Sequence, residues 1–261
     1  MQKTNLSQNS RLFFALIGIF LMISCGSREE VAYFQNAKNF ETIVDTDTFT
    51  PRYKVNDIVS IFVSAYNLEA VKPFNLYKGR EEGGNSSISY VDYLVDIEGN
   101  IDFPVLGKIK LLGLTVGEAK KLLKEKLSDG YLDNPIINIR ITNFRISVLG
   151  EVNSPGTYQI SGERITILEA LGLAGDLTIK GLRKNVMVIR DFNGTKTYTR
   201  VDLTNKEVFN SPVYYLTQND VVYVEPNQSA ISASVIDNRT SIAISIASLL
   251  ITTTAILITR R

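Results

Sequence analysis

Two helix-start signals of the same kind constrain the fold of this chain most strongly. Residues 115–118 (Thr-Val-Gly-Glu) and 166–169 (Thr-Ile-Leu-Glu) are both capping boxes. In this motif the threonine hydroxyl accepts a free backbone N–H, and the glutamate carboxylate accepts the N–H of the threonine. Strand-like segments precede and follow each box. The sequence therefore predicts an α+β fold with two small units, each a sheet with one helix packed on it.

The first unit contains several strand patterns. Residues 57–66 and 137–141 are rich in β-branched or alternating apolar residues, and residues 78–89 read as an exposed loop. Residues 93–97 and 101–103 flank Gly99-Asn100, which predicts a two-residue hairpin because glycine tolerates positive φ.

The second unit repeats this arrangement. Residues 146–152 and 220–224 are predicted strands, and the second capping box opens a short helix through Leu173. Residues 186–190 and 197–201 flank Asn193-Gly194, a strong signal for a hairpin.

Composition excludes several classes of function. The chain has no histidine, which removes Ser-His-Asp and Cys-His catalysis and the zinc motifs built on histidine. The formal net charge of +1 argues against nucleic acid as a partner, because such binders need a basic patch. No nucleotide-binding motif is present. We therefore predict a protein that is not an enzyme and that has no cofactor or metal site.

The amino terminus has the pattern of a lipoprotein signal. Lys3 and Arg11 precede an apolar run over residues 12–23, which is too short to span a bilayer and is typical of a secretory signal. The run ends at Ser24-Cys25-Gly26, and Cys25 is the only cysteine of the chain. We predict that the signal is removed before Cys25 and that Cys25 carries the lipid. The alternative is an ordinary signal peptide with an incidental cysteine.

The carboxyl terminus is uncharged from Thr240 to Thr259. About 20 helical residues span a bilayer core of about 30 Å, so this segment is predicted to be a membrane-spanning helix. Small and hydroxylated residues recur at helical spacing along one stripe, and in lipid such residues favour helix contacts or water-lined surfaces. The stripe, a candidate pore or helix interface, consists of Ser241, Ser245, Ser248, Thr252, Ala255 and Thr259. The alternative is a plain single-pass anchor.

Two longer motifs carry a resemblance to a known family. Residues 95–118 read V-x-x-x-G-x-I-x-x-P-x-x-G-x-I-x-x-x-G-x-T-x-x-E, which resembles the polysaccharide biosynthesis/export domain. Residues 146–176 resemble the start of an SLBB domain, a β-grasp module. In this order the motifs resemble the outer-membrane polysaccharide exporters of the Wza type. One departure is Asn56, because many relatives have glycine before the aspartate that follows.

The resemblance implies a function. It implies a homo-oligomeric ring, an octamer by resemblance, that exports capsular or extracellular polysaccharide, with an inner-membrane polysaccharide co-polymerase as partner. The expected location is the outer membrane, with a lipid anchor and a periplasmic body. The alternative is a lipid-anchored periplasmic glycan-binding or adaptor protein without a pore. In the second domain a loop contact to glycan or partner is a hypothesis for Glu151, Asn153 and Ser154, beside the simpler reading that this loop only shapes a turn.

The expected organisation follows from these segments. The predicted order is residues 1–24 signal peptide, 25–50 lipid-anchored tether, 51–144 polysaccharide export domain, 145–226 SLBB β-grasp domain, 227–236 linker and 237–261 membrane-spanning helix.

Overall fold

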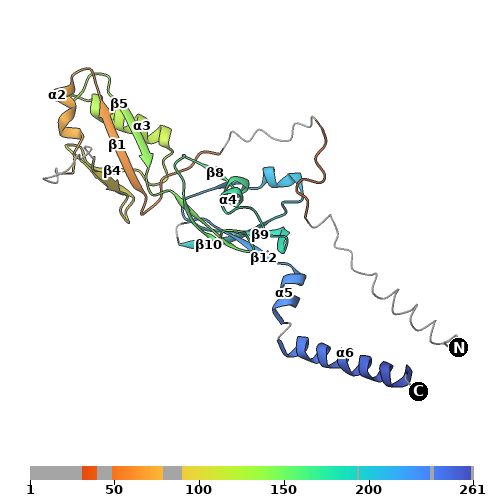
Figure 1. The fold of residues 1–261 in the computed structure, drawn as a ribbon. Helices are drawn as coiled ribbons and strands as arrows, with labels where there is room; N and C mark the ends of the chain where they lie inside the picture. The colour runs from red at the N-terminus through yellow and green to blue at the C-terminus, as the bar shows by residue number, and fades with distance from the viewer. Residues whose placement is uncertain (1–30, 40–48, 79–89, 193, 236–237, 260–261) are drawn as a thin grey trace.

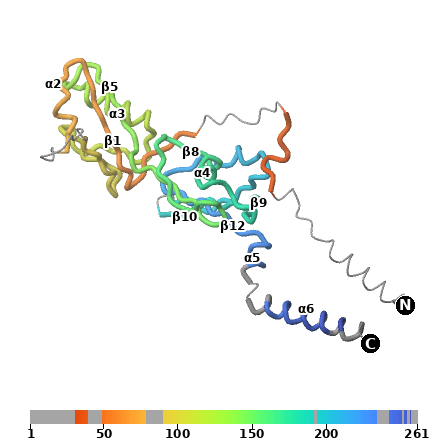
Figure 2. Tube along the Cα trace, viewed as in Figure 1, coloured from red at the N-terminus to blue at the C-terminus, as the bar shows by residue number. Residues whose placement is uncertain are grey.

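Two hydrophobic cores divide the folded part of the chain. The computed structural model describes residues 31–39, 49–78, 90–192, 194–235 and 238–259 (Figures 1 and 2). One core gathers buried side chains from Tyr53 to Ile139, and the other gathers buried side chains from Phe144 to Val224. We call the parts around them the first and the second domain. The structure is α+β, as the sequence predicts.

A three-stranded antiparallel sheet forms the centre of the first domain. Its order is β2-β1-β5, with β1 at Ile58–Ser64, β2 at Asp92–Leu94 and β5 at Ile136–Ile141. Helix α3 (Val116–Ser128) buries Ala119, Leu123 and Leu127 in the same core as the inward-facing residues of β1. Alternation along β1 explains this, because every second side chain of a strand faces the same side.

The first domain is completed by short elements. These are α2 (Leu68–Val71), η3 (Lys72–Phe74), β3 (Asn100–Phe103) and β4 (Gly107–Lys110). Strand β3 pairs with β4 and not with β2, so the hairpin predicted around Gly99-Asn100 is wrong. Gly99 does adopt a φ of +83°, but its turn leads from β2 into a hairpin that closes later, around Val105. The turn therefore forms at the predicted glycine, and the strand that follows it pairs with β4.

A mixed five-stranded sheet forms the second domain, in the order β10-β9-β12-β6-β7. Strands β6 and β12 are parallel, and the other neighbouring pairs are antiparallel. The strands are β6 (Arg145–Gly150), β7 (Gly156–Gln159), β9 (Gly181–Phe192), β10 (Thr195–Val201) and β12 (Val221–Pro226). Pairing of β9 with β10 around residues 193–194 confirms the predicted hairpin.

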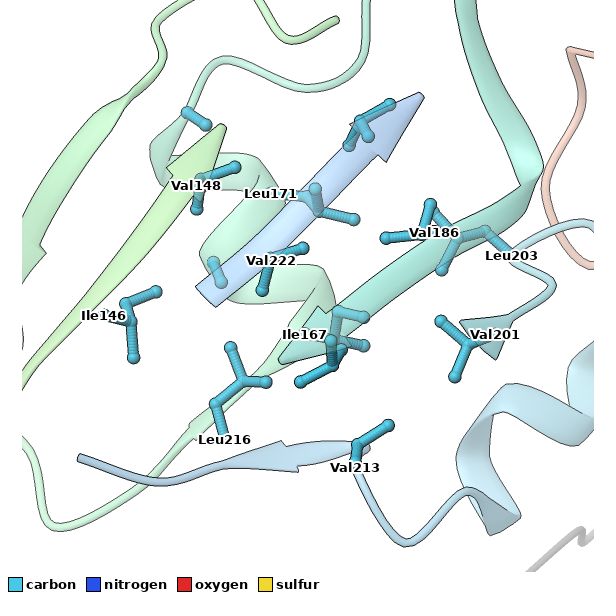
Figure 3. Packing of buried hydrophobic residues seen from close by; sticks show 14 of the residues in the cluster. Ile146, Val148, Ile167, Leu171, Val186, Val201, Leu203, Val213, Leu216 and Val222 are labelled. Carbon is cyan, nitrogen blue, oxygen red and sulfur yellow. The ribbon is translucent and has the colours of Figure 1, made fainter. Parts of the chain in front are cut away.

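Helix α4 (Ile167–Leu173) covers one face of this sheet. Figure 3 shows Ile167 and Leu171 directed at the apolar side chains of the strands, among them Val222 and Val186. The other elements of the domain are β8 (Ile165–Thr166), η4 (Lys206–Asn210) and β11 (Tyr215–Leu216), with α5 (Gln228–Val235) following β12. Both predicted capping boxes are present, with reciprocal bonds between Thr115 and Glu118 and between Thr166 and Glu169.

The backbone conformation of Asn56 explains why asparagine can replace glycine before Asp57. Its φ is +69°, in the left-handed region that glycine adopts freely. Asparagine is one of the few other residues that enter this region at modest cost. The entry turn of the first domain is therefore formed with asparagine in place of glycine.

The carboxyl-terminal segment forms α6 (Asn238–Thr259), a helix of 22 residues. Among the described residues, however, no helix is both long and apolar enough to cross a membrane, so the predicted membrane-spanning helix over residues 237–261 is wrong. The prediction rested on the absence of charged residues, and an uncharged segment is not necessarily apolar. Hydroxyl groups interrupt the apolar surface, and they bond to their own helix: Ser248 donates to the carbonyl of Ser245 at 2.8 Å, and Thr252 to that of Ser248 at 2.7 Å.

Candidate functional site

Polar side chains join the two domains where the chain enters the first domain and where it leaves it. Lys54, just before β1, extends its ammonium to the second domain. Its Nζ lies 2.8 Å from the hydroxyl of Thr217 and 3.5 Å from the carbonyl of Gln218. Burial lowers the pKa of Lys54, while the nearby Asp220 carboxylate raises it. We call this region, with the residues described next, the junction.

Asp220 is the buried anchor of the junction, with no exposed surface. Its carboxylate accepts three bonds from the Arg190 guanidinium, at 2.7 to 3.1 Å. It also accepts the backbone N–H of Thr217 at 2.8 Å and the hydroxyl of Thr217 at 3.0 Å. Because the Thr217 hydroxyl donates to Asp220, its oxygen is free to accept from Lys54. The carboxylate thus orients the group that binds the first domain.

Two side-chain amides bridge the crossover between the domains. Gln218 accepts the N–H of Arg145 at 2.7 Å and donates to the carbonyl of Asn143 at 2.7 Å. Asn143 in turn accepts the N–H of Ile58 at 2.8 Å and donates to the carbonyl of Asn56 at 2.9 Å. Each amide uses its donor and its acceptor, so backbone groups at the crossover are paired.

Asp57 lies beside this crossover and is fully buried. One carboxylate oxygen accepts the backbone N–H of Lys54 at 2.8 Å, and the other has no hydrogen-bond partner among the described residues. Burial raises the pKa of Asp57 to about 6, against a smaller lowering by the Lys54 amide and ammonium.

A cavity of about 310 Å³ opens at the junction. Arg52, Tyr53, Lys54 and Leu112 line it on the side of the first domain, and Arg190 and Thr217 line it on the other side. Arg52 donates to the carbonyl of Gly113 at 2.7 Å and lies 3.3 Å from Glu118. All three cations at the cavity therefore bind protein partners already, so the cavity has no ready anion site among the described residues.

The junction has the chemistry of a structural joint. The hydroxyl of Thr217 lies beside an amine and a carboxylate, but it already donates to Asp220 and accepts from Lys54. No group of carboxylates or cysteines suited to a metal ion occurs among the residues that the structure describes. The arrangement links the two domains through directed hydrogen bonds, and one oxygen of the buried Asp57 carboxylate stays outside this network.

The loop proposed from the sequence, around Glu151, Asn153 and Ser154, lies at the other side of the second domain. Glu151 accepts the hydroxyl of Thr178 at 2.8 Å. The side chain of Asn153 donates to the carbonyl of Gly175 at 2.7 Å, and the backbone N–H of Ser154 donates to the carbonyl of Ala174 at 2.8 Å. These bonds tie the loop to the end of α4. The side chains of Asn153 and Ser154 remain exposed, so a contact there stays a hypothesis.

The other predicted site residues are not brought to the junction. Cys25 and the signal segment lie outside the described residues. Ser245, Ser248 and Thr252 are exposed on α6, whereas the side chains of Ser241 and Thr259 lie outside those described. The predicted role of this stripe as a helix interface stays a prediction.

Sequence reasoning missed the junction residues. Lys54, Arg190 and Gln218 stand far apart in the chain, and each reads as an ordinary surface residue by type. The available signal was position: Lys54 precedes the first strand, and Asp220 opens the last strand of the second domain. Neither position indicates which distant residue will pair with Lys54 or with Asp220.

Two family models match adjoining parts of the chain. The model for polysaccharide biosynthesis/export protein matches residues 50–142, and that for the SLBB domain matches residues 145–224. The junction residues come from both matched segments, apart from Asn143, which lies between them.

Curated relatives agree with this match. The "EPS I polysaccharide export outer membrane protein EpsA" of Ralstonia solanacearum is 28% identical over 142 residues, which cover 53% of this chain and 37% of the relative. The protein of the same name from Ralstonia nicotianae is 32% identical over 121 residues, covering 45% of this chain and 30% of the relative. The matched part thus spans about a third of the length of these relatives.

Asp57→Asn tests the cost of the buried carboxyl. The folded-state pKa of Asp57, about 6, lies above its ordinary value of 3.8, so folding favours the protonated form. That contribution is complete below 3.8 and is lost as pH rises through 6. Asparagine can still accept the Lys54 amide without a charge. We expect Asp57→Asn to raise the free energy of unfolding by about 1–3 kcal/mol at pH 7.5 and to add little near pH 4.

Denaturant unfolding at the two pH values measures this. Asp102→Asn, at an exposed position of β3, is the matched control and should change stability little at either pH. An Asp57→Asn protein that is less stable than the wild type at pH 7.5 would contradict this account of Asp57.

Proposed function

Because the chain belongs to the Wza-type family of polysaccharide biosynthesis/export proteins, we propose that it is an outer-membrane lipoprotein whose copies form a ring for polysaccharide export. The exported polymer is a capsular or extracellular polysaccharide. The family is a transport component and not a group of enzymes, in keeping with the absence of histidine from the chain. The single observation that carries the proposal is the succession of the export match and the SLBB match, residues 50–142 and 145–224.

The junction supports a role as a ring subunit. Neighbouring copies can close a ring only if each subunit presents its two contact surfaces at a fixed angle. The polar network around Asp220, Lys54 and Gln218 holds the two domains in one arrangement. A rigid pair of domains is therefore a suitable building block.

Exposed apolar side chains on the first domain are candidates for subunit contact. Leu68 on α2 is 71% exposed, and Tyr66 just before it is fully exposed. Tyr77 and Leu94, near the edge strand β2, are 69% and 57% exposed. Large apolar side chains that are this exposed can favour association with another protein surface. A second copy of this chain is the partner that the proposal requires.

The route of the polymer also needs partners. We propose that the ring receives polymer from an inner-membrane polysaccharide co-polymerase and that transport through the ring is passive, since the sequence has no nucleotide-binding motif. The body of the protein then lies in the periplasm, and the lipid on Cys25 holds it to the outer membrane.

The mass of the detergent-extracted protein tests ring formation. We expect the wild type in mild detergent to have the mass of a closed oligomer, and Leu68→Glu to reduce it because a charge replaces an apolar contact. Leu173→Glu, at an exposed position of the second domain, is the matched control and should leave the mass unchanged. A monomeric wild type would contradict the ring and favour the adaptor function without a pore.

Cys25→Ser tests the lipid anchor. Cys25 is the only cysteine of the chain and follows the apolar run directly, so it is the only thiol that can take the lipid. We expect the variant to lose labelling by a fatty-acid analogue and to accumulate as an uncleaved precursor. Asn39→Ala serves as the control and should be labelled like the wild type. Undiminished labelling of Cys25→Ser would refute the anchor.

A further inference from the structure

One face of the sheet in the first domain is accessible. Val59, Ile61 and Val63 of β1 are buried in the core to which α3 also contributes. Successive side chains of a strand point to opposite sides, so Ser60 and Phe62 lie on the other face of the sheet. Phe62 is 38% exposed, which shows that the described elements leave this second face uncovered there. We call it the open face.

Two aromatic rings form the centre of the open face. Phe62 lies beside Tyr90, which directly precedes the residues that lead into β2, with ring centroids 5.1 Å apart and planes inclined at 59°. Both side chains are 38% exposed, and neither belongs to the buried core of the domain. Partly exposed aromatic rings at the centre of a sheet face indicate a surface that another molecule covers.

Polar side chains flank these rings on both neighbouring strands. Asn138 of β5 pairs with Phe62 in the sheet register, while Asp92 of β2 and Arg140 of β5 pair with Ser60 from its two sides. Because neighbouring strands lie about 4.8 Å apart, these groups can reach a molecule that rests on Phe62. Asn138 offers a donor and an acceptor, Arg140 offers donors, and Asp92 offers acceptors.

The charges of the open face do not balance. The Asp92 carboxylate already has a cationic neighbour, the Lys78 ammonium at 3.6 Å. Arg140 is exposed, and within the described part of the chain it makes no hydrogen bond or ion pair. One guanidinium is therefore left to bind a carboxylate from outside the domain, which it can do through two parallel hydrogen bonds.

This combination of groups fits a sugar chain better than a second protein surface. A sugar ring has an apolar face of C–H groups and a rim of hydroxyls, which match aromatic rings bordered by amide and charged groups. Aspartate and serine are depleted at protein–protein interfaces, whereas Asp92 and Ser60 lie close to the rings here. The open face also continues along β1 and β5, which are seven and six residues long, and such a strip suits a linear molecule.

We propose that the open face binds the exported polymer, and that this polymer is a linear saccharide with carboxylate-bearing sugars. This contact rests on the proposed export function. A sugar packs on Phe62 and Tyr90, its hydroxyls bond to Asn138 and Asp92, and a carboxylate pairs with Arg140. Each subunit offers the same short strip, so many weak contacts guide the polymer without holding it in place.

Calorimetric titration of the full-length protein in mild detergent tests the contact. The probe is a preparation of short fragments cut from the extracellular polysaccharide of the bacterium that carries this chain. The wild type should bind the fragments, and Phe62→Ala should weaken binding about tenfold because the stacking surface is lost. Phe62→Tyr keeps a ring and should bind like the wild type. Tyr198→Ala, at a 64% exposed position of β10, is the matched control and should also bind normally.

Carboxyl reduction of the same fragments tests the acidic assignment. Reduction converts carboxylates to neutral alcohols and leaves the sugar chain intact. Arg140→Gln should weaken binding of the untreated fragments about tenfold and leave binding of the reduced fragments unchanged. Added salt should weaken wild-type binding of the untreated fragments more than that of the reduced ones.

The outcomes separate the open face from the ring. Circular dichroism of Phe62→Ala should match that of the wild type, because the side chain is partly exposed. Absence of binding by the wild type, or equal binding by the wild type and Phe62→Ala, overturns the contact even if the mass in detergent is that of a closed oligomer.

A folded Phe62→Ala protein whose mass falls to that of a monomer shows that the face joins subunits, which also overturns the contact. Equal wild-type binding of untreated and reduced fragments overturns the acidic assignment. A monomeric wild type that still binds fragments through Phe62 refutes the ring and supports the contact.

Discussion

The buried carboxylate of Asp220 is the interaction on which the arrangement of the molecule depends. A buried charge is costly unless its hydrogen-bonding capacity is met, and this carboxylate accepts from Arg190 and from both donors of Thr217. By engaging the Thr217 hydrogen, it leaves the hydroxyl oxygen to accept from Lys54 of the other domain. One carboxylate therefore organises the end of the second domain and the contact that the first domain makes with it.

Apolar packing stabilises each domain of this protein, and polar hydrogen bonds join the two domains. Each domain has its own hydrophobic core, which stabilises the sheet and the helix packed on it. Between the domains, directed bonds from Lys54, Gln218 and Asn143 set the geometry. Apolar contact is not directional, whereas a hydrogen-bond network fixes an angle. A subunit of the proposed ring needs both properties.

Features of the fold that depend on residues close in sequence could be predicted, whereas pairings between residues far apart in the chain could not. Both capping boxes and the β9–β10 hairpin follow from residues that are neighbours in sequence. The prediction of a hairpin at Gly99-Asn100 was wrong because β3 pairs with β4, although the turn itself forms. The prediction of a membrane-spanning helix was wrong because a segment without charged residues need not be apolar enough to span a membrane. The junction could not be predicted, since nothing in the sequence around Lys54 points to residues 217–220. For the proposed loop, the sequence placed Glu151, Asn153 and Ser154 at a turn, and their bonds to the end of α4 account for that position.

If the junction makes the two domains a single rigid unit, the distance between spin labels on the two domains shows this most directly. In a Cys25→Ser background, Lys121→Cys on α3 and Lys196→Cys on β10 place one label on each domain. Pulsed electron paramagnetic resonance should give one narrow distance distribution, and it should broaden when Lys54→Met and Gln218→Ala remove the bonds across the junction. A broad distribution with the junction intact, or a distribution that those two substitutions leave unchanged, would contradict the account.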